Sequence, residues 1–165
     1  LIITHAACKD IKIDYERPEM LGPDRIANAV AAHRLYGNDC LIIDLGTATT
    51  FTVLREGSLI GGIIAPGVET AAKSLLANTS MLVDVPISPP VSVIGKNTRD
   101  CIRSGLFYGW LSMIKGLVVK IFQNKNIQFP IVVTGGHAKT FAGHFEFPCT
   151  IDPLLTLKGV RAMWR

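Results

Sequence analysis

The segment "LIIDLGTATTFTVL" places an acid, a glycine and three hydroxyl residues between two apolar runs that predict β-strands. Asp44 ends the first run, and Gly46 lets the backbone turn sharply and approach a ligand closely. Thr47 offers a hydroxyl and an N–H group to phosphate oxygens, while the Asp44 carboxylate can hold a cation or its water. The same residues also fit a hairpin in which Asp44 caps the turn, so both interpretations stay open.

A second candidate for chemistry is the segment "GPDR", which comes just before an alanine-rich helical pattern. The Asp24 carboxylate could take a proton from a substrate hydroxyl, and the Arg25 guanidinium could bind a substrate carboxylate through two parallel hydrogen bonds. Pro23 suits the first turn of a helix, where its missing N–H has no partner to lose. The alternative is that Asp24 only caps or charges the helix N-terminus.

Two further segments carry weaker signals. In "VVTGGHA" a Gly-Gly turn follows an apolar strand and has no side chains that would keep an adenine or a ribose away. In "GKNT" the hydroxyl residue Thr98 lies at the predicted start of a helix, where backbone N–H groups attract anions. An ordinary strand-to-helix turn explains the first segment as well.

These residues must be positioned by an α/β chain. Hydrophobic periodicity predicts strands over 11–15, 40–45, 50–55, 58–65, 131–133 and 149–152, and helices over 25–36, 68–77, 97–122 and 154–164. The segment 137–145 is expected to form a short helix or a turn between the last two strands. The pair Glu56-Gly57 predicts a tight hairpin, and Gly61 with Gly62 predicts a bulge or a close backbone approach.

The composition limits the partners of the chain. Its 165 residues, 48% hydrophobic and 18% charged, suit one domain or one large lobe of a two-lobed protein. The net charge is +4, and the cations are spread along the chain, which argues against a nucleic-acid partner and fits small anionic ligands. The most apolar stretch, 105–122, contains Lys115 and Lys120, so we expect no membrane span.

The cysteines point to a reducing compartment. Cys8, Cys40, Cys101 and Cys149 form no CxxC pair and no zinc-ligand spacing. Each lies in or beside an apolar segment, so we expect buried free thiols and a cytoplasmic location.

In their order along the chain, these segments resemble a lobe of the actin/sugar-kinase/heat-shock-ATPase superfamily. Within it, the chain resembles the type III pantothenate kinases from about Tyr15 onward, through "LGPDRIANAVAA", "IIDLGTATTFTV", "GGIIAPGVETAAKSLLANTSML", "IGKNTRDCIRSGLFYG" and "VVTGGHA". The resemblance implies a ribonuclease H-like lobe, in which a mixed sheet contains a three-stranded antiparallel meander and has flanking helices. It also implies that 1–36 end an N-terminal lobe and include the substrate-site helix, while 37–165 form the C-terminal lobe.

The resemblance implies ATP-dependent phosphorylation of pantothenate to 4′-phosphopantothenate, the first step of coenzyme A biosynthesis. Asp24 would be the general base, Asp44 would hold a monovalent cation, potassium or ammonium, and Thr47 would contact ATP, which brings Mg²⁺. Pantothenate would be bound by Tyr15, Gly22, Pro23, Asp24, Arg25 and Thr98. Thr98 would reach it across the interface of a homodimer, which the long apolar helix with Phe107, Tyr108, Trp110 and Leu111 also favours.

One part of the family pattern is missing. The resemblance implies a further phosphate motif of the Asp-Gly-Asn-Thr type in an N-terminal lobe, and this sequence contains none. Because the chain also begins at Leu1 and not at Met, we expect a fragment that is inactive alone. Two alternatives stay open, namely a non-catalytic kinase-like transcriptional regulator and a kinase for another small hydroxylated substrate.

Overall fold

The computed structural model describes residues 2–77, 84–125 and 128–164. Its elements are β1 (Lys12–Ile13), the 3-10 helix η1 (Pro18–Met20), α1 (Pro23–Tyr36), β2 (Cys40–Leu45), β3 (Ala48–Arg55), β4 (Ser58–Pro66), α2 (Val68–Ala77), α3 (Thr98–Lys125), β5 (Ile131–Thr134), α4 (Ala138–Ala142), β6 (Thr150–Ile151) and α5 (Leu155–Met163). The predicted order of strands and helices is confirmed, with η1 as an addition. Residues 78–83, which hold the end of the "LLANTSML" segment, lie outside the described residues.

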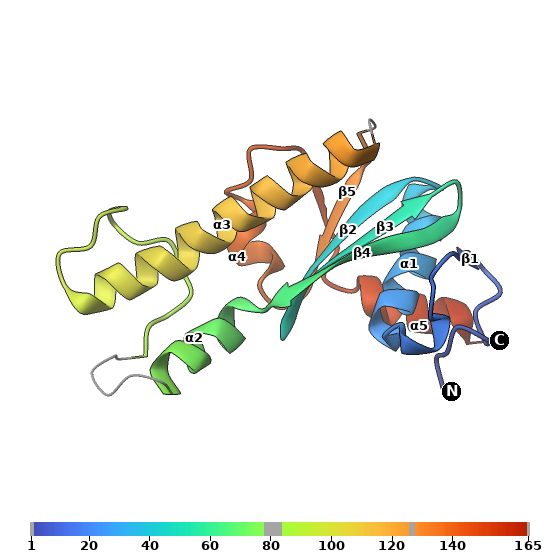
Figure 1. Cartoon of the computed structure of the whole chain (residues 1–165), viewed down its shortest axis with the longest axis horizontal. Helices are drawn as coiled ribbons and strands as arrows, with labels where there is room; N and C mark the ends of the chain where they lie inside the picture. Colours follow the sequence, from blue (N-terminus) through green and yellow to red (C-terminus); the bar gives the residue numbers. More distant parts are fainter. Residues whose placement is uncertain (1, 78–83, 126–127, 165) are drawn as a thin grey trace.

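The strands form one mixed sheet in the order β1-β4-β3-β2-β5-β6 (Figure 1). Strands β2, β3 and β4 form an antiparallel meander, whereas β1, β5 and β6 run parallel to their neighbours. The predicted mixed sheet with a three-stranded meander is therefore confirmed. Because β5 lies parallel beside β2, the segments that follow these two strands leave the sheet at the same edge.

Helices cover both faces of this sheet, with α1 and α5 on one face and α3 and α4 on the other (Figure 1). Successive strand residues point to opposite faces, so β2 contributes to both cores. Ile42 packs in one cluster with Ile26 and Val30 of α1, while Ile43 packs in the other with Phe107 of α3. Asp44 has the same parity as Ile42 and therefore faces α1.

The longest element is α3, whose first turns extend beyond the sheet (Figure 1). Its C-terminal half packs on the sheet, and the fully buried Phe107 stacks on Phe141 with ring centroids 5.3 Å apart. Among the described helices, α3 alone is long and apolar enough to cross a membrane by length and composition, with 22% of its most apolar stretch buried. Lys115 and Lys120 lie in this helix, and the absence of a membrane span stays a prediction.

The glycine predictions for β3 and β4 are confirmed. Glu56 and Gly57 form the hairpin with φ values of 50° and 73°, and a register shift interrupts the pairing of the two strands. A Cβ on Gly62 would lie 1.9 Å from the carbonyl oxygen of Phe51 and 2.7 Å from Nη2 of Arg25. Position 62 therefore needs a glycine because another chain segment occupies the space of a side chain.

The cysteines are all free thiols, as predicted, but the expectation that all are buried is wrong. Only Cys40 is buried, and burial raises the pKa of its thiol to about 12. Cys101 is exposed because it lies in the first turn of α3, which extends beyond the sheet.

Candidate active site

The first turn of α1 presents the Asp24 carboxylate to solvent. The helix begins at Pro23, two residues before the predicted range 25–36, and Pro23 lies in its first turn as expected. Its N-cap is Gly22, which offers no side chain for a hydrogen bond. Asp24 is exposed and accepts no hydrogen bond from the described residues, so it does not act as a cap. A Cβ on Gly22 would lie 2.5 Å from Oδ1 of Asp24, so the glycine leaves room for the carboxylate.

The next residue, Arg25, lies inside the protein between α1 and the sheet. Its Nε donates to Oγ1 of Thr52 at 3.1 Å, and its Nη1 donates to the hydroxyl of Tyr15 at 3.4 Å. The guanidinium also lies 5.7 Å from the centre of the Tyr15 ring. Nη2 is buried without a hydrogen-bond partner, beside Gly62. As folded here, Arg25 holds Tyr15 in place and keeps one unused donor, and it presents no open two-pronged fork to solvent.

Asp44 is the second-to-last residue of β2, and its carboxylate faces α1. Its Oδ2 accepts a 2.9 Å hydrogen bond from Nδ2 of Asn28, so Asp44 does not cap the β2–β3 turn. Burial raises the pKa of the Asp44 carboxyl, the Asn28 hydrogen bond lowers it, and the negative charge of Asp24 raises it again. The net effect is an upward shift of this pKa.

The second oxygen of Asp44 lies in a space that two glycines leave open. A Cβ on Gly135 would lie 2.5 Å from Oδ1, and a Cβ on Gly46 would lie 3.4 Å from it. Thr50 and Thr134 stand directly beside Asp44 on the two neighbouring strands. Among the described residues no group of three His, Cys, Asp or Glu side chains could hold a metal ion. One carboxylate with neutral oxygens around it fits a monovalent cation.

The turn between β2 and β3 rests on the start of α2. The carbonyl oxygen of Thr47 accepts hydrogen bonds from the backbone N–H of Gly67 at 3.0 Å and from Oγ1 of Thr70 at 2.7 Å. A Cβ on Gly67 would lie 2.4 Å from the same oxygen, so this contact is between backbones. With its backbone held in this way, Thr47 is exposed and can meet a ligand.

The Gly-Gly turn after β5 lies beside this β2–β3 turn. The backbone N–H of His137 donates to the carbonyl oxygen of Leu45 at 3.1 Å, and Gly135 has a φ of 92°. Nε2 of His137 lies 3.1 Å from Oε1 of Glu69 at the start of α2. The segments "DLGT" and "TGGHA", which are distant in sequence, therefore meet at one edge of the sheet.

Within one copy of the chain, Thr98 lies away from the other predicted site residues. The start of α3 lies at the opposite end of the molecule from α1 (Figure 1). Asn97 is the N-cap there, because its Oδ1 accepts a 2.9 Å hydrogen bond from the backbone N–H of Asp100.

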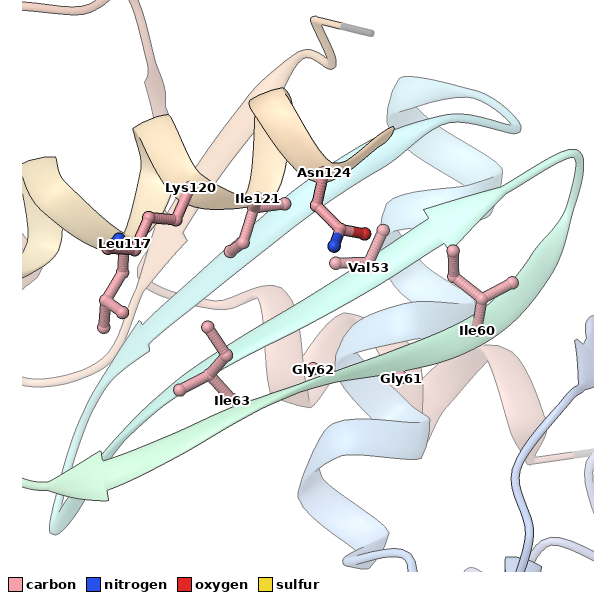
Figure 2. Close-up of a pocket in the computed structure, with 9 residues that line it drawn as sticks. All are labelled: Val53, Ile60, Gly61, Gly62, Ile63, Leu117, Lys120, Ile121 and Asn124. Atoms are coloured by element: carbon pink, nitrogen blue, oxygen red, sulfur yellow. The ribbon is translucent and has the colours of Figure 1, made fainter. Parts of the chain in front are cut away.

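A separate apolar groove lies on the other face of the sheet, between α3 and strands β3 and β4 (Figure 2). Its volume is about 310 Å³, and its lining residues are Val53, Ile60, Gly61, Gly62, Ile63, Leu117, Lys120, Ile121 and Asn124. Because Asp44 faces α1, this groove is not part of the carboxylate cluster.

Three residues of the cluster were missed from the sequence. Asn28 is 1% exposed in an alanine-rich helix and follows Asp24 by one helical turn, a signal that could have found it. Thr52 and Thr156 have no such local signal, because their contacts depend on how β3 and α5 pack against α1.

The mixed sheet with helices on both faces has the fold of the actin-like ATPases. MreB 5 of Spiroplasma citri bound to AMPPNP matches with a TM-score of 0.55 at 15% identity, over 85% of this chain and 57% of that one. A protein described as a Baf family transcriptional activator from Campylobacter jejuni matches with a TM-score of 0.63 at 24% identity, over 93% of this chain and 66% of that one. Likenesses at such low identity show the fold alone.

The sequence comparisons show the family. The sequence model of the family "Type III pantothenate kinase" matches residues 1–120. Type III pantothenate kinase of Koribacter versatilis (strain Ellin345) is 37% identical over 92% of this chain and 56% of its own length. That of Dehalococcoides mccartyi is 37% identical over 100% of this chain and 64% of its own length. The chain belongs to the type III pantothenate kinase family, and it spans about 56% to 64% of the length of these relatives.

Proposed function

We propose that the intact protein phosphorylates pantothenate with ATP to give 4′-phosphopantothenate, the first step of coenzyme A biosynthesis. Family membership supports this reaction, and one structural observation carries it. Asp24 precedes Asn28 by one turn of α1, and Asn28 donates to Asp44, so the two acids lie at the same end of the site. Asp24 is exposed and accepts no hydrogen bond from the described residues, whereas Asp44 is held by Asn28. Two acids in such different surroundings suit two different tasks in phosphoryl transfer.

Asp24 is the general base in this proposal. A base must come within hydrogen-bond reach of the hydroxyl that attacks the phosphate, and an exposed carboxylate that no described residue engages is available for that contact. Pro23 begins α1, and Gly22 leaves room beside it for this carboxylate. Phosphoryl transfer asks for little more than positioning, charge neutralisation and such a base.

Pantothenate would lie beside Asp24, against Tyr15 and the first turn of α1. Arg25 fixes Tyr15 through the 3.4 Å hydrogen bond and the ring contact. Because Arg25 is itself 4% exposed, its part in this site is to hold Tyr15 in place. We therefore keep Tyr15, Gly22, Pro23, Asp24 and Arg25 as the pantothenate-binding set.

The nucleotide would bind at the sheet edge formed by the Thr47 turn and the Gly-Gly turn after β5. Thr47 contacts ATP in this proposal, and Mg²⁺ accompanies the nucleotide. A potassium or ammonium ion at Asp44 would neutralise phosphate charge. Oδ1 of Asp44, in the space beside Gly46 and Gly135, would bind this cation.

Thr98 would complete the pantothenate site of a second copy in a homodimer. Its distance from Asp24 within one copy supports this arrangement (Figure 1). So does the neighbouring loop, where Val91 and Ile94 are 104% and 79% exposed. This loop is tied to α3, because Arg103 donates to the backbone and side chain of Ser88 at 3.1 Å and 2.8 Å. A partner that covers these apolar side chains would gain hydrophobic free energy.

Asp24→Asn tests the proposed base. In a coupled assay, the intact variant should lose pantothenate phosphorylation by a factor of about 10² to 10⁴, the usual contribution of a positioned base. Asp39→Asn is the matched control, because Asp39 accepts a backbone hydrogen bond from Glu56 that an amide oxygen also accepts. Retained activity in the Asp24 variant would remove the assigned role.

A thermal-shift comparison separates pantothenate from other hydroxylated substrates. A ligand at one hundred times its dissociation constant adds about 2.7 kcal/mol to the stability of the protein that binds it. Pantothenate should therefore raise the melting temperature of the intact protein, and simple sugars should leave it unchanged. A shift with a sugar and none with pantothenate would favour another substrate. A titration with DNA tests the alternative of a transcriptional regulator. For a cytoplasmic kinase without a nucleic-acid partner, we expect no salt-dependent binding to DNA.

A further inference from the structure

Asn28 links α1 to the proposed cation ligand from inside the protein. It follows Asp24 by four residues, so the two side chains lie on the same side of α1, one turn apart. Only 1% of Asn28 is exposed, and both polar ends of its amide are used. Nδ2 donates to Oδ2 of Asp44 at 2.9 Å, and Oδ1 accepts from Oγ1 of Thr156 at 2.7 Å.

Chemistry fixes the direction of this chain of hydrogen bonds. An ionised carboxylate only accepts, so the amide nitrogen of Asn28 must face Asp44. The amide oxygen then faces α5, where a hydroxyl is the group that can donate to it. Asp44 therefore fixes which way the Asn28 amide is turned, and the Thr156 hydroxyl, by donating to the amide oxygen, holds it in that orientation. Asn28 in turn engages Oδ2 of Asp44 and leaves Oδ1 without this hydrogen bond.

Close packing of two helices sets the reach of Thr156. A Cβ on Gly159 would lie 1.9 Å from the carbonyl oxygen of Ala27, so α5 and α1 meet backbone to backbone. Thr156 precedes Gly159 by three residues and lies on the same side of α5. The contact brings its hydroxyl to Asn28, the residue next to Ala27.

We propose that Asn28 and Thr156 are positioning residues for cation binding, which hold Oδ2 of Asp44 so that Oδ1 stays in the space between Gly46 and Gly135. This inference rests on the proposed cation site at Asp44. It assigns a role at the site to α5, which has no predicted site residue. Residues that hydrogen-bond to a metal-binding side chain usually change the metal affinity by about 10- to 100-fold when they are removed.

The test is a thermal-shift titration of the intact protein with potassium chloride, without ATP or pantothenate. Choline chloride keeps the ionic strength constant, and ammonium chloride is titrated in parallel. Thr156→Val removes the hydroxyl at nearly constant shape, and Thr156→Ser keeps it. Thr150→Val on the exposed strand β6 is the matched control. Asn28→Asp puts a second acid beside Asp44 and removes the donor.

The wild type should be stabilised by potassium or ammonium with a measurable half-saturation concentration. Thr156→Val should raise that concentration about tenfold, Thr156→Ser should restore it, and Asn28→Asp should abolish the effect. A purely structural role for Thr156 would lower the melting temperature and leave the half-saturation concentration unchanged, which would overturn the proposal. No stabilisation of the wild type by either cation would overturn it as well.

Failure of the proposed reaction gives a different result. If the intact protein does not phosphorylate pantothenate but its cation-dependent stabilisation weakens in Thr156→Val, the reaction is wrong and the positioning role stands.

Discussion

The indole nitrogen of Trp110 donates a 3.2 Å hydrogen bond to the hydroxyl of Thr49. Thr49 is 1% exposed and lies at the start of β3, two residues after Thr47. Trp110 belongs to α3, which packs on the face of the sheet opposite to α1. The long helix is thereby tied to the turn proposed to contact ATP.

Trp110→Phe should destabilise the protein and weaken nucleotide binding. Phenylalanine keeps the aromatic packing but removes the N–H donor, so the buried Thr49 hydroxyl loses a partner at a cost of about 1–3 kcal/mol. Urea unfolding measures the stability, and a titration with ATP measures the affinity, which should fall severalfold. Trp164→Phe is the control, because Trp164 is 71% exposed. Equal effects of both substitutions would contradict a specific role for the Trp110 hydrogen bond.

Gly135→Ala should damage both the fold and the proposed cation site. Gly135 has a φ of 92°, which side chains rarely adopt, and its Cβ would lie 2.6 Å from the backbone of Leu45 and 2.5 Å from Oδ1 of Asp44. Backbone strain alone costs about 1–2 kcal/mol, and the contacts add to it. The melting temperature and the potassium-dependent stabilisation should both decrease.

Gly143→Ala is the matched control for that substitution. Gly143 has a φ of −67°, and a Cβ there would meet nothing within 4 Å. Its stability should stay within about 0.5 kcal/mol of the wild type. If Gly135→Ala is as stable as this control, then a Cβ at position 135 does not collide with Leu45 and Asp44, which would contradict the structure.

Acid should destabilise the fold through Asp152, which is 4% exposed between α1 and α5. Burial alone would raise the pKa of its carboxyl. The pKa is nevertheless lowered overall, because the carboxylate accepts hydrogen bonds from Lys158, Tyr36 and the N–H of Leu154 and lies beside the Lys158 charge. A carboxyl with a depressed pKa in the folded state contributes stability above its unfolded pKa of about 3.9. That stability is lost as the pH falls through the lower, folded value.

Tyr36→Phe should make this loss smaller. The hydroxyl of Tyr36 donates to Oδ2 of Asp152 at 2.9 Å, so its removal moves the folded pKa of Asp152 back toward the ordinary value. Urea unfolding between about pH 2 and pH 6 should show lower stability at pH 6 and a flatter slope in acid than in the wild type. An unchanged slope would mean that Tyr36 has no part in setting this pKa, which would then depend on Lys158 and the N–H of Leu154.

The sequence predicted what depends on local pattern. The strands around Asp44, the start of α1 at Pro23 and the hairpin at Glu56 each follow from periodicity or from the chemistry of one or two residues. The order of the segments also predicted the mixed sheet with its three-stranded meander. Contacts set by packing could not be predicted in this way. The Thr156 hydroxyl reaches Asn28 only because α5 approaches α1 at Gly159, and no local pattern encodes that approach.

Ile94→Glu should separate the proposed dimer and lower kinase activity together. Ile94 is 79% exposed beside the start of α3, where Thr98 would reach the site of a second copy. A charge at the centre of an apolar contact costs several kcal/mol, whereas on a free surface it changes stability little. Light scattering on the intact protein should show a dimer for the wild type and a monomer for the variant at micromolar concentration.

The activity measurement tells whether the interface serves the reaction. If Thr98 of one copy completes the site of the other, the monomeric variant should show a raised KM for pantothenate, while its melting temperature stays near that of the wild type. Leu35→Glu, at a 54% exposed position near the end of α1, introduces the same charge away from this loop and should stay dimeric and active. A wild-type protein that is monomeric and active would show that one copy suffices, and Thr98 would then have no part in catalysis.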